Sequence, residues 1–294
     1  MSCSNFLRRW LFTKERFGVL WTRGGLGNQL FQITALAFFS KKLFFSPIVA
    51  PSNLRKSRDN FFPQYRNLGI EEIYWSRNDK VDPTRTLELV LSLLYRIFSR
   101  FFPNKIFSES QITNSTILPK LFFIQDYFET REYPDRMSED SLFRLIATLE
   151  EAALFHETNF GSKNHATAVI HVRLTDSIKS LDPTKRLSKL QTVVNNLGIA
   201  EHIIFDVFSD DIILAKEILQ DFFSSTTKRY PEEFLKLSPI ALLGSLLKYD
   251  VIIASKSTLC WWACYLRSRM SKVPATIVAD FSPRLMRDDW LNSE

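Results

Sequence analysis

The chain has few cysteines and no long apolar run. These two features argue against a disulfide-linked secreted protein and against a membrane-spanning protein. Three cysteines among 294 residues are too few for a disulfide framework, and Cys260 and Cys264 lie one helical turn apart, so we expect a reducing compartment. No apolar stretch reaches the roughly 18 residues that cross a bilayer. Residues 1–18 carry too many charges and too short an apolar core to resemble a secretory signal. We therefore expect a protein that is neither secreted nor membrane-spanning.

The charge balance is only mildly basic. Lys and Arg number 38 against 32 Asp and Glu, which gives a formal net charge of +6 and a pI of about 9.2. This suits a phosphate-bearing ligand or an anionic membrane surface and falls short of a dedicated nucleic-acid binder. The basic residues of 1–17 and Leu87–Phe102 fit a solvated face by default, and contact with anionic lipid is left open. The four histidines show no metal-ligand spacing, so we predict no metal.

Glycine is scarce as well, yet three glycines cluster. Gly24, Gly25 and Gly27 stand within four positions, although the whole chain has eight glycines. They lie between a predicted strand, Phe17–Thr22, and a predicted helix, Leu30–Leu43. The spacing matches neither the dinucleotide fingerprint nor the P-loop. Backbone amides at such a helix start favour a phosphate or sugar oxygen, and a tight packing turn explains the glycines equally well.

The second half of the chain alternates between strands and helices. This alternation predicts an α/β fold with parallel sheets covered on both faces. The polar segment 159–164 predicts a boundary between an N-terminal domain, 1–160, and a C-terminal domain, 161–294. The predicted strands are Ala166–Val172, His202–Phe208, Val251–Ala254 and Ala275–Ala279, and the helices between them are Pro183–Leu197, Ile212–Phe222, Pro239–Lys248 and Thr258–Arg269. In the first half, Pro47–Ala50 reads as a strand and Lys120–Phe128 as a strand with its exit loop, and Leu87–Phe102 and Ser138–Glu157 read as helices.

Ligands of open parallel sheets bind at the carboxyl ends of the strands, and polar residues follow three of these strands. They are His171, Arg173, Asp176, Asp210, Asp211, Ser257 and Thr258. Arg173 could hold a diphosphate in bidentate fashion. A buried core histidine at 171 and helix capping by the Asp and Ser/Thr groups are the ordinary structural alternatives. Trp261 and Trp262 lie in an apolar helix and are expected in the core.

Four segments together resemble a known family. They are Gly24–Gln32 (GGLGNQLFQ), His171–Asp176 (HVRLTD), Phe208–Asp211 (FSDD) and Ala254–Ala263 (ASKSTLCWWA). In this order they resemble the motifs of the α-1,2-fucosyltransferases, glycosyltransferase family eleven, of the bacterial surface-polysaccharide type. The resemblance implies a GT-B fold, in which two Rossmann-like domains face a cleft. It also implies inverting transfer of fucose from GDP-fucose to a galactose-type hydroxyl, with no metal or other cofactor.

The resemblance also implies roles for individual residues. Arg173 would contact the donor diphosphate and help GDP to leave, and Asn28 would orient donor or acceptor. Donor-binding residues would be Gly25, Gly27, His171, Asp176, Asp210, Asp211, Ser257 and Thr258. Glu129 is a weak candidate for the general base, and a solvated loop carboxylate is the simpler interpretation. The N-terminal domain would take a glycan or lipid-linked glycan and the C-terminal domain the GDP-sugar, on the cytoplasmic side and with peripheral membrane attachment left open.

Some positions depart from the family pattern. Leu174 replaces a second arginine, Ile240 stands where an Asp is expected near the guanine, and Lys256 replaces an Asn. The first two changes affect donor recognition. Two alternatives therefore stay open: a transferase of the same fold that uses another nucleotide sugar, and a catalytically weak relative that binds a nucleotide or glycan.

Overall fold

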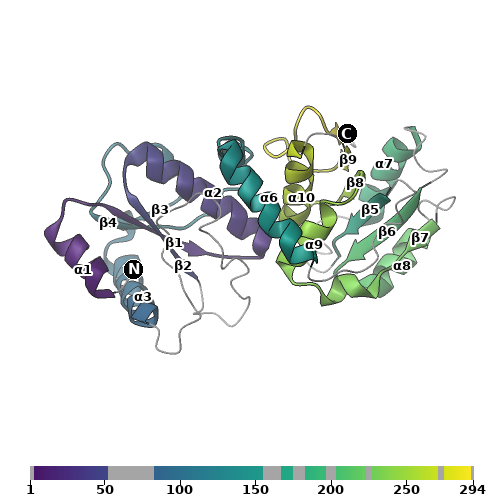
Figure 1. Cartoon of the computed structure of the whole chain (residues 1–294). Helices are drawn as coiled ribbons and strands as arrows, with labels where there is room; N and C mark the ends of the chain where they lie inside the picture. The colour runs from purple at the N-terminus through teal and green to yellow at the C-terminus, as the bar shows by residue number, and fades with distance from the viewer. Residues whose placement is uncertain are drawn as a thin grey trace. The chain divides into compact units, whose positions relative to one another are not determined.

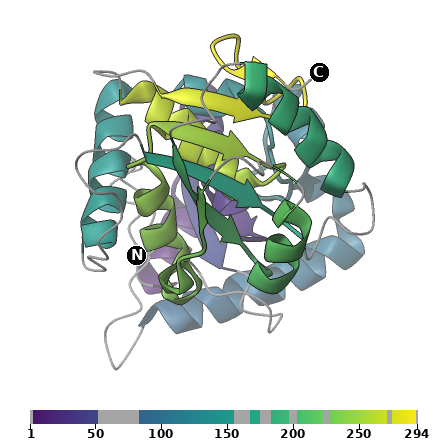
Figure 2. The same ribbon diagram turned by 90° about the vertical axis from the view of Figure 1, so that its right-hand side faces the viewer.

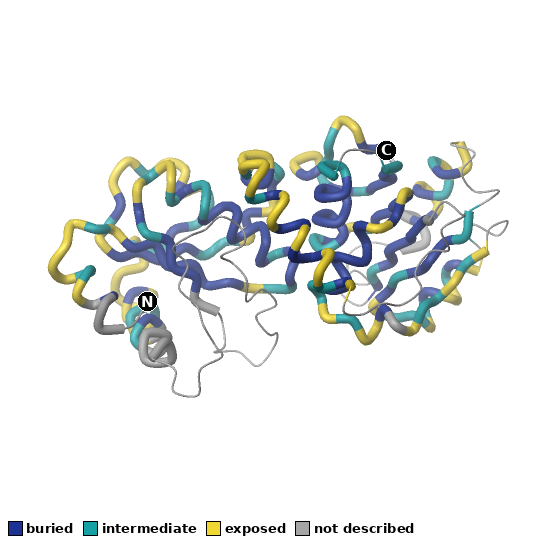
Figure 3. Tube along the Cα trace, in the orientation of Figure 1, coloured by how far each residue is buried: buried dark blue, intermediate teal, exposed yellow. Residues whose placement is uncertain are grey.

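The structure is a computed structural model that describes residues 3–51, 83–154, 167–174, 183–196, 203–220, 222, 227–270 and 275–292. The chain forms two compact units, Met1–Arg144 and Leu145–Glu294. Each unit contains one sheet whose paired strands all run parallel, which confirms the predicted α/β class. In both units the strands are mostly buried and the connecting loops more exposed (Figure 3).

The sheet of the first unit has four strands in the order β2-β1-β4-β3 (Figure 1). Their bounds are Phe17–Thr22 for β1, Ser46–Pro51 for β2, Ile106–Phe107 for β3 and Leu121–Ile124 for β4. The central strand β1 is buried along its whole length. This explains why its sequence is a continuous apolar run and does not alternate between apolar and polar residues.

Helices cover both faces of this sheet. On one face, α1 (Cys3–Phe12) and α3 (Pro83–Phe101) pack against Phe17, Val19 and Trp21, which alternate along β1. The long helix α2 (Leu26–Leu43) lies over the opposite face (Figure 1). There Gly18 leaves room for Phe45, because a Cβ at position 18 would lie 2.5 Å from the Phe45 ring. Short helices complete the unit: η2 (Pro103–Lys105), α4 (Glu109–Thr113) and α5 (Glu132–Asp135).

The sheet of the second unit has six strands in the order β10-β9-β8-β5-β6-β7. They are β5 (Thr167–Val172), β6 (Ile204–Ser209), β7 (Thr227–Arg229), β8 (Val251–Ala254), β9 (Thr276–Ala279) and β10 (Leu291–Asn292). The chain starts near the middle at β5, moves outward through β6 and β7, and then returns to β8 on the other side. Figure 2 shows these strands side by side, from β9 in yellow through β8 in yellow-green and β5 in teal to β6 in green. Such a reversal of strand order is where doubly wound sheets bind ligands.

Two groups of helices pack on the second sheet. The helices α7 (Pro183–Asn196) and α8 (Ile212–Gln220) form an apolar core with alternate residues of β5 and β6. The others are η3 (Glu232–Lys236), α9 (Pro239–Leu246) and α10 (Thr258–Arg269). Trp261 and Trp262 of α10 are fully buried, and Trp261 Nε1 donates to the Leu285 carbonyl at 2.7 Å. This confirms the prediction that both tryptophans belong to the core.

The two units divide inside α6 (Glu139–Leu154), after Arg144. The sequence interpretation placed the boundary later, at 159–164, a segment outside the described residues. The reason for the earlier division is packing. A Cβ at Gly244 of α9 would lie 2.0 Å from the carbonyl oxygen of Leu149, so the backbones of α6 and α9 come very close. The C-terminal part of α6 therefore belongs to the second unit.

A buried carboxylate joins two strands of the second unit. Asp206 of β6 is fully buried and accepts hydrogen bonds from Arg229 of β7, at 2.6 Å to Nε and 2.9 Å to Nη2. The hydroxyl of Tyr249 donates to the same carboxylate at 2.6 Å. Burial and the adjoining charge of Asp206 raise the pKa of Tyr249. Because the carboxylate is paired on two sides, this group is structural.

Candidate functional site

The ends of β5 and β8 meet at one hydroxyl group. Nδ1 of His171, in β5, lies 2.7 Å from Oγ of Ser255, which directly follows β8. The backbone N–H of Arg173 donates to the same Oγ at 3.3 Å. The two strands are parallel neighbours, so their carboxyl ends lie at the same edge of the sheet. Ser255 therefore holds the backbone from which the Arg173 side chain projects.

The end of β6 joins the same cluster from the other side of β5. Oδ1 of Asp210 accepts the backbone N–H of Leu174 at 2.8 Å. Phe208 is the β6 partner of His171 in register, and the two rings stack with centroids 5.0 Å apart and an interplanar angle of 28°. The structure thus brings His171, Arg173 and Asp210 together, as the strand-end argument predicts. We call these three residues and Ser255 the strand-end cluster.

Burial controls the charge of His171. The side chain is 4% exposed, and this burial is the main reason that its pKa falls from 6.5 to about 4. The carboxylate of Asp210 acts in the opposite direction, and the Arg173 cation adds to the lowering. Nδ1 of a neutral ring can accept a hydrogen bond from the Ser255 hydroxyl. Ser255 Oγ can then accept a second hydrogen bond, from the backbone N–H of Arg173. Such an imidazole serves to position its neighbours.

The adjacent residues Asp210 and Asp211 accept hydrogen bonds from different parts of the backbone. Oδ1 of Asp211 accepts the backbone N–H of Leu214 at 3.0 Å, which is the geometry of an N-cap on α8. Ser209 Oγ accepts the Asp211 N–H at 3.1 Å and stiffens the same turn. Asp210 instead faces the loop after β5, as described above. Helix capping, the ordinary structural role of such aspartates, is therefore the role of Asp211. Asp210 belongs to the strand-end cluster instead.

Ser257 and Thr258 lie where α10 begins. Ser257 is the N-cap residue and is 6% exposed, yet its side chain makes no capping hydrogen bond. Thr258 is half-buried in the first turn. Both residues belong to the loop after β8, which also contains Ser255, so they share an edge of the sheet with the strand-end cluster. Asp176, the remaining predicted donor residue, lies outside the described residues.

The glycine loop of the first unit is shaped around Asn28. Gly24 has φ +77°, and a Cβ there would lie 2.4 Å from Asn28 Nδ2. Both the backbone conformation and the lack of space therefore favour glycine at position 24. Gly25 is the N-cap residue of α2, and Gly27 is buried in its first turn. Within the described part of the chain, the buried Oδ1 of Asn28 has no hydrogen-bond partner. A buried amide oxygen of this kind is suited to accept a ligand hydroxyl.

Two glutamines of the same motif have a structural role that the sequence did not reveal. Gln32 receives the Arg23 N–H at Oε1, at 2.9 Å, and donates from Nε2 to the Arg23 carbonyl at 3.1 Å. Gln29 Nε2 donates to the Gly24 carbonyl at 3.1 Å. The two side chains replace backbone hydrogen bonds that the loop cannot make. The motif GGLGNQLFQ therefore encodes a loop that its own glutamine side chains brace.

Glu129 is exposed on the loop that follows β4. The strands β4 and β1 are parallel neighbours, so this loop and the glycine loop leave the same edge of the first sheet. The residue before it, Phe128, is buried and has φ +56°, and its ring packs against Phe39 and Tyr133. The buried ring fixes the start of the loop, whereas Glu129 itself is exposed.

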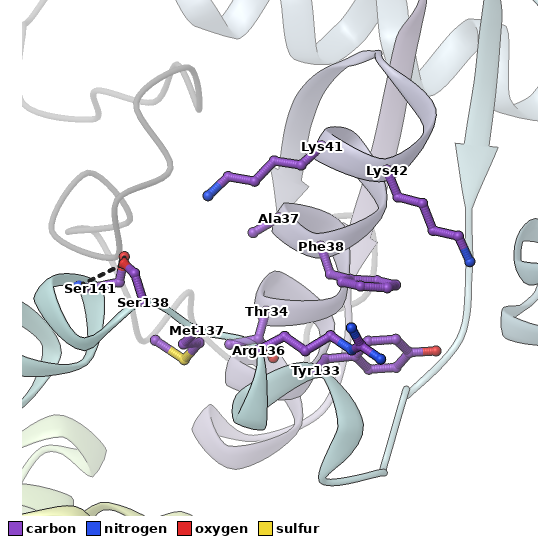
Figure 4. Close-up of a pocket in the computed structure, with 10 residues that line it drawn as sticks. All are labelled: Thr34, Ala37, Phe38, Lys41, Lys42, Tyr133, Arg136, Met137, Ser138 and Ser141. Carbon is purple, nitrogen blue, oxygen red and sulfur yellow. Dashed lines mark hydrogen bonds between the residues drawn. The ribbon is translucent and has the colours of Figure 1, made fainter.

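A pocket of about 330 Å³ lies elsewhere in the first unit, between residues 34–42 of α2 and residues 133–141 (Figure 4). Phe38 lies between two cations, with Lys42 Nζ at 5.7 Å and Arg136 Cζ at 5.3 Å from the ring centroid. Along the helix axis the pocket begins about 9 Å and ends about 21 Å from Asn28, at 1.5 Å per residue. It therefore lies away from the glycine loop.

Metal and membrane features can be stated for the described residues alone. Among them no group of three or more His, Cys, Asp or Glu side chains could hold a metal ion. No helix in the described part of the chain is long and apolar enough to cross a membrane.

Comparison with known proteins gives matches in solved structures only. No family model matches the chain, and no curated protein matches it. POFUT1 in complex with GDP-fucose is 12% identical with a TM-score of 0.47, over 93% of this chain and 99% of that one. The fucosyltransferase NodZ from Bradyrhizobium is 12% identical with a TM-score of 0.43, over 86% and 94%. A mutant of Arabidopsis thaliana FUT1 with GDP is 10% identical with a TM-score of 0.47, over 94% and 72%. Likeness at this level carries no conclusion about function.

Proposed function

We propose that the chain is an inverting glycosyltransferase that moves L-fucose from GDP-fucose to a galactose-type hydroxyl of a glycan. The linkage would be α-1,2, no metal would be needed, and the product would be a surface polysaccharide. One observation carries the proposal: the strand-end cluster joins three neighbouring strands at the carboxyl edge of one parallel sheet. This is where such sheets bind nucleotides. Two of the family-like motifs, HVRLTD and FSDD, supply His171, Arg173 and Asp210, and ASKSTLCWWA supplies Ser255.

Arg173 would act on the leaving group. Its backbone is held by Ser255, and the next residue, Leu174, is held by Asp210. A planar guanidinium on a fixed backbone can contact two phosphate oxygens at once. As the bond between the sugar C1 and the GDP oxygen breaks, negative charge grows on the phosphate and the cation stabilises it. The acceptor hydroxyl oxygen forms the new bond at C1 from the opposite side and loses its proton.

The first unit would contribute to the acceptor side of the reaction. The unsatisfied Oδ1 of Asn28 would accept a hydrogen bond from a substrate hydroxyl. Glu129 would take the proton that the acceptor hydroxyl loses, which is the general-base role that the resemblance leaves open for it. Gly25 and Gly27 would keep the backbone of α2 open to the ligand. The membrane location of the acceptor, as a lipid-linked glycan on the cytoplasmic side, is part of the same proposal.

Turnover with a matched pair of arginine variants tests this proposal. We expect Arg173→Lys to lose roughly 10²–10³-fold in kcat, because lysine cannot reproduce the bidentate contact. The control is Arg136→Lys, which changes an exposed arginine of the first unit. The assay supplies GDP-fucose and galactose-terminated glycans in the presence of a chelator. Equal turnover of Arg173→Lys and the control would refute the role of Arg173.

One observation favours an alternative donor. Leu174 stands where the family has a second arginine, and it is fully buried in the core of the second sheet. The buried Leu174 side chain therefore cannot contact the ligand in place of that arginine. A nucleotide sugar other than GDP-fucose is consequently the second candidate, and donor competition with UDP- and ADP-sugars distinguishes the two. A protein that binds nucleotide without turnover is the third.

A further inference from the structure

The helices α1 and α3 use only one side each to cover the first sheet. On α3, Leu91 and Phe98 point inward and join Phe6 of α1 and Phe123 of β4 in a common core. Figure 1 shows the two helices next to one another on this face of the sheet. The outward sides of α1 and α3 therefore face away from the sheet.

The outward side of α3 is nevertheless apolar. Leu93 is 59% exposed, Ile97 36% and Phe101 64%, and the spacing of four residues puts them in one row along the helix. Two more apolar side chains extend this surface at the end of α1, where Leu11 is 58% and Phe12 81% exposed. Soluble monomers rarely leave such large side chains together in water unless the patch binds something.

The same surface is strongly cationic. Segments 8–12, 90–105 and 117–121 contain six Lys and Arg residues and no carboxylate. Of these, Arg9 is paired with Glu15, to which its Nε donates at 2.7 Å. Arg96 and Arg100 form the exposed row beside the apolar row of α3. The cations lie against rings as well: Arg100 Cζ is 5.6 Å from the Phe101 centroid.

We propose that this outward surface of α1 and α3, the cationic face, binds the surface of an anionic bilayer. Apolar side chains of an interfacial helix enter the boundary between headgroups and acyl chains, while neighbouring Lys and Arg pair with the lipid phosphates. A purely acidic partner would leave Leu93, Ile97 and Phe101 uncovered, and an apolar partner would leave the arginines unpaired. A bilayer surface satisfies both at once. The proposal is independent of the proposed transferase activity.

Vesicle sedimentation of the full chain tests the proposal. We expect the protein to bind vesicles of phosphatidylcholine containing about one third phosphatidylglycerol, and to bind pure phosphatidylcholine at least roughly tenfold more weakly. Binding should fall as salt is raised from about 0.05 M to 0.5 M, because screening acts on exposed charges. Equal binding to both vesicle types, or no binding to either, would overturn the proposal.

Two sets of substitutions separate the apolar and the cationic contributions. The triple variant Leu93→Gln/Ile97→Gln/Phe101→Gln removes the apolar row, and we expect a loss of at least about tenfold in affinity for the anionic vesicles. The double variant Arg96→Gln/Arg100→Gln should lose about tenfold to thirtyfold, and its residual binding should depend less on salt. All five side chains are exposed, so both variants should keep the wild-type thermal unfolding temperature.

Matched controls lie in the second unit. Ile213→Gln/Leu235→Gln removes two apolar side chains that are 83% and 57% exposed, and Lys189→Gln/Lys236→Gln removes two exposed cations. These controls should bind as the wild type does. A loss of the same size in the controls would show that overall charge or hydrophobicity decides binding, and would refute a defined face. A dimer in vesicle-free solution that the triple variant abolishes would refute it too, because a second copy of the chain would then cover the face.

Discussion

A single hydroxyl, that of Ser255, holds both His171 and Arg173: its Oγ lies 2.7 Å from His171 Nδ1 and 3.3 Å from the Arg173 backbone nitrogen. Ser255 directly follows β8, whereas His171 and Arg173 lie at the end of the neighbouring strand β5, 84 and 82 positions away in the chain. The contact makes the position of Arg173 depend on a residue that does not itself need to touch the donor.

The first prediction concerns Ser255→Ala. Removing the hydroxyl leaves a buried ring nitrogen of His171 without its partner, which should lower the free energy of unfolding by about 1–3 kcal/mol. It should also weaken donor binding, because Arg173 loses its support. Thermal unfolding and donor titration measure the two effects. Ser257→Ala is the matched control, since this buried serine makes no capping bond, and it should lower the free energy of unfolding by less than about 1 kcal/mol. An equally large stability loss in both variants would contradict the assignment.

The second prediction follows from the pKa of His171, which falls from 6.5 to about 4 in the folded protein. Because the folded state resists protonation, the unfolded state binds more protons between these two values. His171 therefore leaves stability unaffected above pH 6.5 and reduces it as the pH falls toward 4, by up to about 1.4 kcal/mol per pH unit. Denaturant unfolding of the wild type and of His171→Gln should show a pH slope that is smaller in the variant. Identical slopes would mean that His171 is not buried neutral.

The third prediction concerns the glycine loop. Gly24→Ala forces a side chain into φ +77° and against Asn28, so it should destabilise the fold by about 2–3 kcal/mol. Gly25→Ala at φ −74° should cost less than about 1 kcal/mol. If the clash with Asn28 matters, Gly24→Ala/Asn28→Ala should be less destabilised than the sum of its single variants. Strict additivity of the two changes would show that the strain lies in φ alone.

The fourth prediction tests the buried carboxylate of β6. Asp206→Asn should lower the free energy of unfolding by about 3 kcal/mol, at the lower end for breaking a buried pair, because Arg229 keeps access to water. Tyr249→Phe removes one hydrogen bond and should cost about 1 kcal/mol. Neither change touches the strand-end cluster, so donor affinity should stay at the wild-type value in folded protein. A tenfold loss of donor affinity would show that this network also supports the site.

Much of the fold could be predicted because the signals are local. The strand Phe17–Thr22, the strand Val251–Ala254 and the helix Thr258–Arg269 have in the structure the bounds that their apolar patterns predict. The helix α1 and the very short strands β3, β7 and β10 were missed. Two or three residues carry too little periodicity to indicate a strand. The ten residues of α1 lie in segment 1–18, whose charges argue against a secretory signal and fit a solvated basic face.

The site could be predicted in part, for a physical reason. Parallel strands end at the same edge of a sheet, and this alone predicts that His171, Arg173 and Asp210 lie at one edge. The contact of Ser255 with His171 could not be predicted, because it requires β8 to lie beside β5, and strand order is a tertiary property. The domain boundary has the same difficulty, since the close approach of Gly244 to Leu149 depends on how α9 packs.

The central claim is that the strand-end cluster binds a nucleoside diphosphate through Arg173. Calorimetry of the purified protein with GDP, UDP, ADP, GDP-fucose and GDP-mannose, without metal, tests it most directly. We expect preference for GDP and GDP-fucose, and a loss of about tenfold to a hundredfold in affinity with Arg173→Ala, since hydrogen bonds to charged groups contribute about 1.5–3 kcal/mol. Preference for another nucleotide would keep the site and discard fucose. Absence of binding to every nucleotide, or unchanged affinity in the variant, would contradict the claim.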